Sequence, residues 1–213
     1  MDGLVLLVFF SVSIPLALSL ALLEKKARVT VAYMIIGMLV ALIVSQINSI
    51  LLSLFDHNND LFVTTITPVT EEIIKALPIL YYAFVFKPER GVMINISLAI
   101  GLGFAIFENL IMLANSGYSA TIIWVLIRGF GAGLMHSLCT VMVGMCTIYI
   151  RQNKRLFLCG IFSVLSLAII YHSIYNCLVI SEYKYLGILL PLLTYSPFVI
   201  HQIKTRRNND ESV

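Results

Sequence analysis

Apolar residues fill most of the chain in seven long runs, each separated from the next by a short polar segment. An α-helix rises 1.5 Å per residue, so about 20 apolar residues cross the roughly 30 Å hydrocarbon layer of a membrane. The pattern predicts an all-α fold, a polytopic membrane bundle of about seven transmembrane helices. The predicted spans are 3–22, 30–55, 61–86, 92–114, 121–150, 156–180 and 186–203.

The composition favours the same class of protein. Of the 213 residues, 60% are hydrophobic and only 12% are charged, which lies outside the range of ordinary soluble domains. The connections hold only a few residues, so we predict a single transmembrane bundle over 1–203 and a short, irregular cytoplasmic tail over 204–213. The four cysteines lie inside apolar runs without a CxxC pair, which is typical of packing residues rather than of metal ligands or disulfides.

Basic residues alternate between the two ends of the predicted helices. Eleven of the fourteen lysines and arginines follow the first, third, fifth and seventh runs, whereas the connections 56–60, 115–119 and 181–185 hold a single lysine. By the positive-inside rule, the N-terminus is expected outside and the C-terminus in the cytoplasm. The first basic cluster follows its apolar run, which favours a retained anchor over a cleaved signal peptide. The net charge of +3 is therefore a membrane signal and not a nucleic-acid signal.

Ionisable residues also occur inside the apolar runs. Each costs about 2.5–3.5 kcal/mol at the centre of a membrane helix when it is unpaired, so such residues are expected to face one another or a water-filled cavity. Most of them lie roughly 9–18 Å from the outer ends of their predicted helices, which predicts one site near the extracytoplasmic side. The residues are Glu71, Glu72, Lys75, Glu108, Arg128, His136 and His172.

Spacing along the helices indicates which of these groups can meet. Lys75 follows Glu71 by four residues and Glu72 by three, so it can pair with both. Asn176 follows His172 by four residues and shares its helix face. Pro68 precedes the acidic pair by a few residues, and we expect it to kink the third helix because it removes a backbone hydrogen bond.

Glycines mark places where helices are expected to pack closely. Gly101 and Gly103 lie in the fourth run and allow another helix to approach. Three alternate glycines in the fifth run predict tight packing or a local irregularity between Arg128 and His136.

Two classes of function fit a buried cluster of glutamate and histidine. One is amide hydrolysis, in which a glutamate accepts a proton from water and neighbouring groups stabilise the oxyanion. The alternative is a small proton- or ion-coupled transporter that uses the same groups as a relay. A transporter would be expected to show internal repeats with matching interrupted helices, and the sequence has no such repeat. Hydrolysis is therefore preferred; a receptor or scaffold is a weaker third possibility.

Four motifs follow one another on consecutive predicted helices. They are Glu71-Glu72-x-x-Lys75, Phe104-x-x-x-Glu108-Asn109, an isolated His136 after the glycine-rich stretch, and His172-x-x-x-Asn176. In this order the chain resembles the PrsW family of intramembrane proteases, within the clan of CAAX-processing and bacteriocin-processing proteases. The resemblance covers about 60–180, which is therefore the expected catalytic core.

The resemblance implies a role for most of these residues. Glu71 would activate the attacking water and Glu72 would support it, while His172 and Asn176 would stabilise the oxyanion. Glu108 stands where the CAAX-processing branch has a histidine that assists the base, so His136 is expected to supply the imidazole instead. Lys75 and Arg128 are interpreted as supporting charge partners.

The mechanism is open between two versions at this stage. The site either holds no cofactor or binds Zn²⁺, for which Glu71, Glu108, His136 and His172 are the candidate ligands. The chain has no HExxH motif, and a metal-free glutamate mechanism is slightly preferred.

The resemblance also implies a setting and a partner. We expect an integral protein of a prokaryotic cell membrane (inner or plasma), with the lipid bilayer and a membrane-anchored protein substrate as partners and no nucleic acid. The substrate would be a regulatory protein such as an anti-sigma factor, cut near the extracytoplasmic side.

Overall fold

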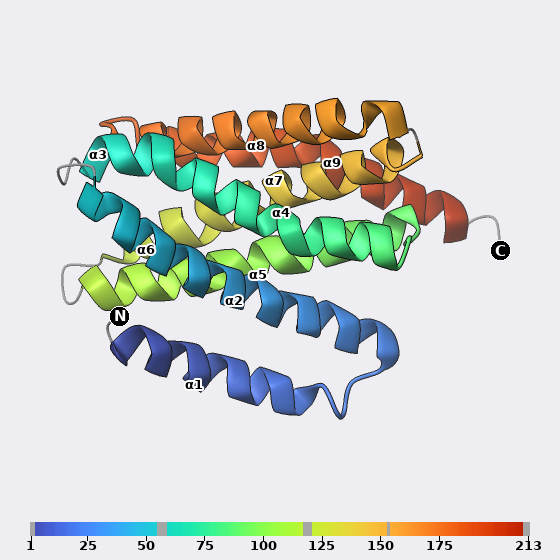
Figure 1. Cartoon of the computed structure of the whole chain (residues 1–213), viewed down its shortest axis with the longest axis horizontal. Helices are drawn as coiled ribbons and strands as arrows, with labels where there is room; N and C mark the ends of the chain where they lie inside the picture. Colours follow the sequence, from blue (N-terminus) through green and yellow to red (C-terminus); the bar gives the residue numbers. More distant parts are fainter. Residues whose placement is uncertain (1–2, 55–58, 117–120, 153, 211–213) are drawn as a thin grey trace.

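A computed structural model describes residues 3–54, 59–116, 121–152 and 154–210, and over these ranges helices joined by short connections are the regular secondary structure (Figure 1). The elements, in chain order, are α1 (Gly3–Ser19), α2 (Lys25–Leu54), α3 (Asn59–Leu61), η1 (Phe62–Ile66), α4 (Thr67–Val85), α5 (Arg90–Ser116), α6 (Ile122–Leu126), η3 (Ile127–Ala132), α7 (Gly133–Ile150), η4 (Lys154–Leu156), α8 (Phe157–Ile180) and α9 (Leu186–Asp210). The third predicted helix is the continuous run α3–η1–α4, and the fifth is α6–η3–α7. The helical bundle expected from the sequence is thus confirmed.

The end of the last helix corrects one expectation. The irregular tail was predicted to begin at residue 204, yet α9 continues to Asp210, and 211–213 lie outside the described residues. The sequence after Pro197 holds neither glycine nor proline up to that point, so nothing in the local propensities ends the helix earlier.

Within the described ranges, four helices are long and apolar enough to cross a membrane by length and composition alone. They are Lys25–Leu54, Arg90–Asn115, Ile122–Ile150 and Phe157–Ile180. Gly3–Ser19 and Leu186–Pro197 are apolar but shorter, and α4 carries the buried charges. The protein is an integral membrane helical bundle, whereas the crossing of all seven helices and the N-outside orientation stay predictions.

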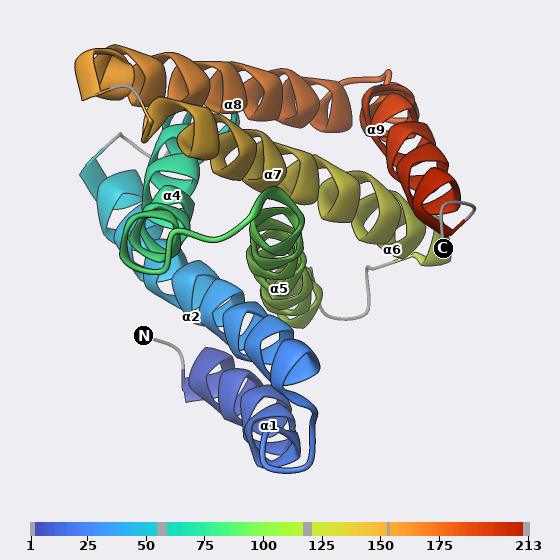
Figure 2. The ribbon, with the colours of Figure 1, turned by 90° about the vertical axis from the view of Figure 1, so that its right-hand side faces the viewer.

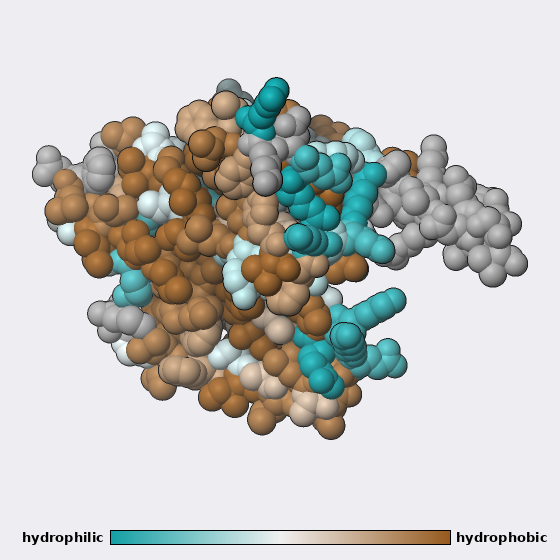
Figure 3. All heavy atoms as spheres, turned by 45° about the vertical axis from the view of Figure 1, so that its right-hand side comes forward, coloured by the Kyte–Doolittle hydropathy of each residue, from teal (hydrophilic) through white to brown (hydrophobic). Residues whose placement is uncertain are grey.

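The basic clusters share one end of the molecule. The α1–α2, α4–α5 and α7–α8 connections lie at the same end as the C-terminal part of α9, and the N-terminal end of α1 lies at the other end (Figure 1). Hydrophilic side chains gather at that end of an otherwise largely hydrophobic surface (Figure 3). An arrangement of this kind is what the alternating basic clusters require if that end faces the cytoplasm.

Helix α7 lies at the centre of the bundle, packed against α4, α5, α8 and α9 (Figure 2). Helix α5 lies between α7 and α2, and Gly101 and Gly103 face these two neighbours. A Cβ at Gly103 would collide with the backbone of Met34 in α2, and a Cβ at Gly101 would meet the backbone at His136 and Ser137 in α7. The expected close approach is therefore present on both sides of α5.

Replacing Gly103 by alanine is expected to destabilise the bundle, because the added methyl group forces α5 away from α2. Overpacking of this kind typically costs about 1–3 kcal/mol. The matched control is Gly91→Ala in the first turn of the same helix, where a Cβ has no neighbour within 4 Å and alanine should be neutral or slightly favourable. Thermal unfolding in detergent measures both; equal midpoints for the two variants would contradict the assigned helix contact.

Two π-helical segments, η1 and η3, interrupt the helices beside the polar cluster. Segment η1 ends just before Pro68, which lacks the N–H group that would continue the α-helical bonding to the preceding turn. Segment η3 contains Gly129 and Gly131, two of the three alternate glycines, and carries Arg128, so the local irregularity expected there is present. Such segments often occur at functional sites.

Candidate active site

The predicted polar residues meet in the interior of the bundle. Glu71, Glu72 and Lys75 come from α4, and His136 and His172 come from α7 and α8. These five side chains are all at most 4% exposed. Glu108 of α5 and Arg128 of η3 complete the cluster, and the Glu108 side chain is partly accessible. The helices thus place groups that are up to a hundred residues apart in direct contact.

One half of the cluster is centred on Glu72. Its Oε1 atom lies 2.6 Å from Lys75 Nζ and 2.8 Å from His172 Nδ1. Lys75 Nζ also lies 2.8 Å from His136 Nδ1 and 4.4 Å from the centre of the Phe104 ring. Lys75 was expected to pair with both glutamates, and its ion pair is with Glu72.

The other half is centred on Glu108. Its Oε2 atom lies 2.7 Å from His136 Nε2, and its Oε1 atom accepts a hydrogen bond from Arg128 Nη2 at 2.7 Å. Asn109 holds the same guanidinium, since its Oδ1 accepts from Arg128 Nε at 3.1 Å. The adjacent Glu108 and Asn109 of the second motif therefore both hold Arg128.

These contacts determine the tautomers of the two histidines. An ammonium group only donates, so His136 Nδ1 accepts from Lys75 and Nε2–H donates to the Glu108 carboxylate. A carboxylate only accepts, so His172 Nδ1–H donates to Glu72. The lone pair of His172 Nε2 is then left on the side of Glu71, whose Oε2 lies 3.8 Å away.

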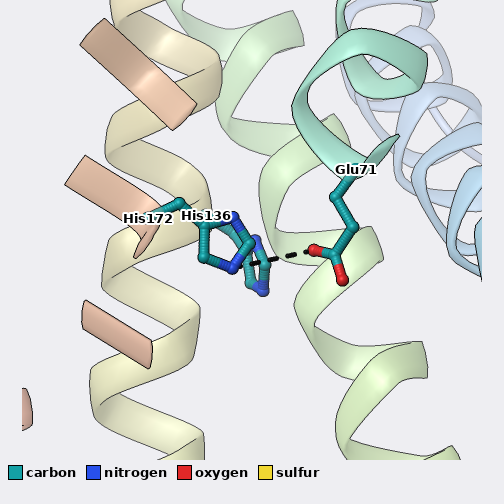
Figure 4. Close-up of side chains that lie close together, drawn as sticks. All are labelled: Glu71, His136 and His172. Carbon is teal, nitrogen blue, oxygen red and sulfur yellow. Dashed lines mark ion pairs between the residues drawn. The ribbon is translucent and has the colours of Figure 1, made fainter. Parts of the chain in front are cut away.

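Glu71, His136 and His172 form a group that can hold a metal ion. Their ligand atoms all lie within 4.8 Å of one another, and Figure 4 shows Glu71 pointing toward the two imidazole rings. Ligands bound at 2.0–2.2 Å in a tetrahedron lie roughly 3.3–3.5 Å apart, close to the 3.8 Å between His172 Nε2 and Glu71 Oε2. Glu71 Oε2 is buried and has no hydrogen-bond partner in the structure. Glu71 and His172 therefore fit a metal ion well.

Two details modify the ligand set expected from the sequence. Glu108 lies outside the potential metal group found among the described residues, because its two oxygens face Arg128 and His136. His136 belongs to the group, but Lys75 contacts its Nδ1. If His136 binds a metal through Nδ1, the ion has to replace Lys75 at that nitrogen. The Glu108 contact at Nε2 would meanwhile hold the ring in place, as carboxylates do for histidine ligands.

The side-chain amide of Asn176 is already hydrogen-bonded within the bundle. It shares the face of His172, but its Nδ2 atom donates to the backbone oxygen of Val63 at 2.9 Å. The bond ties α8 to η1, where the π-helical backbone precedes Pro68. Sequence reasoning also missed Tyr175 of the same helix, which is 1% exposed; its aromatic character inside an apolar run gave no signal.

A helical membrane bundle with carboxylates and imidazoles gathered in its interior has the architecture of an intramembrane hydrolase. The family comparison identifies the group: residues 25–202 match the PrsW family of intramembrane metalloproteases. The match covers most of the chain, so the protein belongs to this family. No curated protein and no solved structure matches the chain.

Family membership makes the protein an intramembrane protease, a hydrolase, and supports the first of the two function classes considered above over the transporter. The family is described as a family of metalloproteases, and Glu71, His136 and His172 can hold a metal ion. Of the two mechanisms left open by the sequence, the metal-dependent one is therefore favoured over the metal-free one preferred at that stage.

Proposed function

We propose that the protein hydrolyses a peptide bond of a membrane-anchored protein near the extracytoplasmic side, with Glu71 accepting a proton from the attacking water. The observation that carries this proposal is the Glu71 carboxylate itself. Its Oε2 atom is buried without a hydrogen-bond partner and faces His172. A buried acceptor without a partner is uncommon in folded proteins, and a reacting water would supply the missing donor.

The chemical steps need only one proton acceptor. Water adds its oxygen to the carbonyl carbon of the scissile bond and passes a proton to Glu71, while the carbonyl π electrons move to oxygen. The intermediate then collapses, the C–N bond breaks, and Glu71 returns the proton to the leaving nitrogen. The products are a carboxylic acid and an amine, and Glu71 is regenerated as a carboxylate.

The other charged residues position the reacting groups. Glu72 orients His172 through Nδ1, and Glu108 orients His136 through Nε2. Lys75 and Arg128 offset the charge of these two glutamates. A buried charge that is unpaired is costly, so the two ion pairs allow three carboxylates to lie in the bundle interior.

We assign the metal as Zn²⁺, held by Glu71, His136 and His172, because carboxylate and imidazole donors suit this ion. When bound, zinc supplies Lewis-acid polarisation and lowers the pKa of a coordinated water. A carboxylate has two oxygens, so Glu71 can serve as a ligand and still accept a proton.

The substrate class follows from the family resemblance and from the position of the site. We propose a membrane-spanning regulatory protein, such as an anti-sigma factor, in the cell membrane of a prokaryote. The site lies inside the bundle, which suits a substrate whose cleavage site is itself within or next to the bilayer.

The direct test is cleavage by the purified protein in detergent or proteoliposomes. A library of single-span membrane peptides with flanking residues is incubated with the protein, and the fragments are identified by mass spectrometry. We expect cleavage near the extracytoplasmic end of responsive peptides, and none with Glu71→Gln prepared in parallel. Peptides that all remain intact with the folded, zinc-loaded protein would count against the proposed function.

A further inference from the structure

Tyr175 carries a buried polar atom that no contact in the structure explains. Among the described residues, three buried side-chain polar atoms have no hydrogen-bond partner: Glu71 Oε2, Ser97 Oγ and Tyr175 Oη. Nearly all buried polar groups of folded proteins are hydrogen-bonded, so each exception requires an explanation. Ser97 Oγ lies against Gly144 where α5 meets α7, eleven residues before Glu108 on the same helix, and is set aside because it lies well away from the polar cluster. The missing hydrogen-bond partners of Glu71 Oε2 and Tyr175 Oη still require an explanation.

The Tyr175 hydroxyl lies beside the polar cluster. Tyr175 follows His172 by three residues on α8, so the two side chains project from neighbouring positions of one helix. The hydroxyl lies against η3, where it is 2.8 Å from the position that a Cβ at Gly131 would occupy. The charges of Arg128 and Glu108, which form an ion pair, act on both Tyr175 and Glu71. The two unexplained atoms therefore belong to the same electrostatic environment.

Several donors near the cluster are already engaged. The Asn176 amide donates to Val63 O, and His172 Nδ1 donates to Glu72. Arg128 donates through Nη2 and Nε to Glu108 and Asn109. An oxyanion that develops in the site needs a donor that is not already bonded elsewhere, because breaking an existing bond would offset the gain.

We propose that Tyr175 is a catalytic residue whose hydroxyl donates a hydrogen bond to the carbonyl oxygen of the scissile peptide as that oxygen becomes an oxyanion. The inference rests on the proposed function and deepens it. Glu71 is the acceptor that hydrolysis requires and Tyr175 is the donor. The proton stays on the phenol throughout, so the step changes no bond of Tyr175.

The test removes only the hydroxyl, by Tyr175→Phe. With a peptide that the wild-type protein cleaves, kcat is expected to fall roughly 10²–10³-fold, the usual effect of losing one oxyanion donor. KM, the zinc content and the thermal midpoint are expected to stay unchanged. Tyr171→Phe is the matched control on the same helix: its hydroxyl bonds to Thr194 Oγ1 at 2.6 Å, and its loss should leave kcat near the wild-type value.

A second variant tests the same contact without removing the phenol. Gly131→Ala places a methyl group 2.8 Å from the Tyr175 hydroxyl, which is closer than van der Waals contact, so it should displace the hydroxyl and lower kcat in the same way. A Tyr175→Phe protein whose kcat stays within threefold of wild type overturns the inference, and so does a loss of activity that is accompanied by lost zinc or a lower midpoint. Failure of the wild-type protein to cleave any peptide instead removes the proposed function itself.

Discussion

Replacing Glu71 by glutamine is expected to abolish peptide cleavage while the protein stays folded. Glutamine keeps the size of the side chain but cannot accept the proton of the attacking water, and a general base typically contributes 10²–10⁴-fold. Because Oε2 has no hydrogen-bond partner, the substitution breaks no hydrogen bond of that atom. The measurements are the cleavage rate and the thermal midpoint in detergent. The matched control is Glu89→Gln in the exposed α4–α5 connection, which should change neither.

Comparison with Glu72→Gln makes this prediction sharper. That variant should lose activity and also stability, since it weakens the partner of Lys75, which is fully buried. Leaving a buried charge without its partner typically costs 3–5 kcal/mol. The two adjacent glutamates are thus expected to behave differently. Glu71→Gln should lower only the cleavage rate, whereas Glu72→Gln should lower both the cleavage rate and the stability of the fold. Full cleavage by Glu71→Gln would remove that residue from the catalytic role.

Removal of the metal is expected to reduce peptide cleavage about as strongly as Glu71→Gln does. A chelator should stop cleavage by the purified protein, and added zinc should restore it, because the polarising ion is lost and then returned. His172→Ala should remove stoichiometric zinc as well as activity, since ligand loss lowers affinity. Zinc content measured by atomic emission gives a readout that does not depend on a substrate.

The matched control for the metal experiment is His57→Ala in the polar segment 56–60, which should keep zinc and activity. Metal-free protein that cleaves at full rate in the presence of a chelator would overturn the zinc assignment. The mechanism would then be the metal-free glutamate version that the residue pattern alone preferred, with Glu71 acting without a Lewis acid.

The membrane architecture could be predicted from the sequence because its determinants are local. A run of about 20 apolar residues specifies a helix long enough for the bilayer, whatever its neighbours are, and the helical bundle follows from seven such runs. Helix periodicity also placed Lys75 near Glu72 and put Phe104 and Glu108 on one face, since spacings of three and four residues bring side chains together within one helix. Both π-helical segments lie where proline or glycine marked an irregularity.

Partner choice between helices was decided only by the tertiary structure. Periodicity gives the direction of a side chain from its own helix axis, but the group it meets depends on the rotation and separation of the neighbouring helix. Gly101 sets the distance from α5 to α7, and this approach allows Glu108 to reach His136. Contacts with Arg128 and His136 take Glu108 out of the potential metal group. Packing of α8 against η1 and η3 directs the Asn176 amide to Val63 O and leaves the hydroxyl of Tyr175 beside Gly131 without a partner.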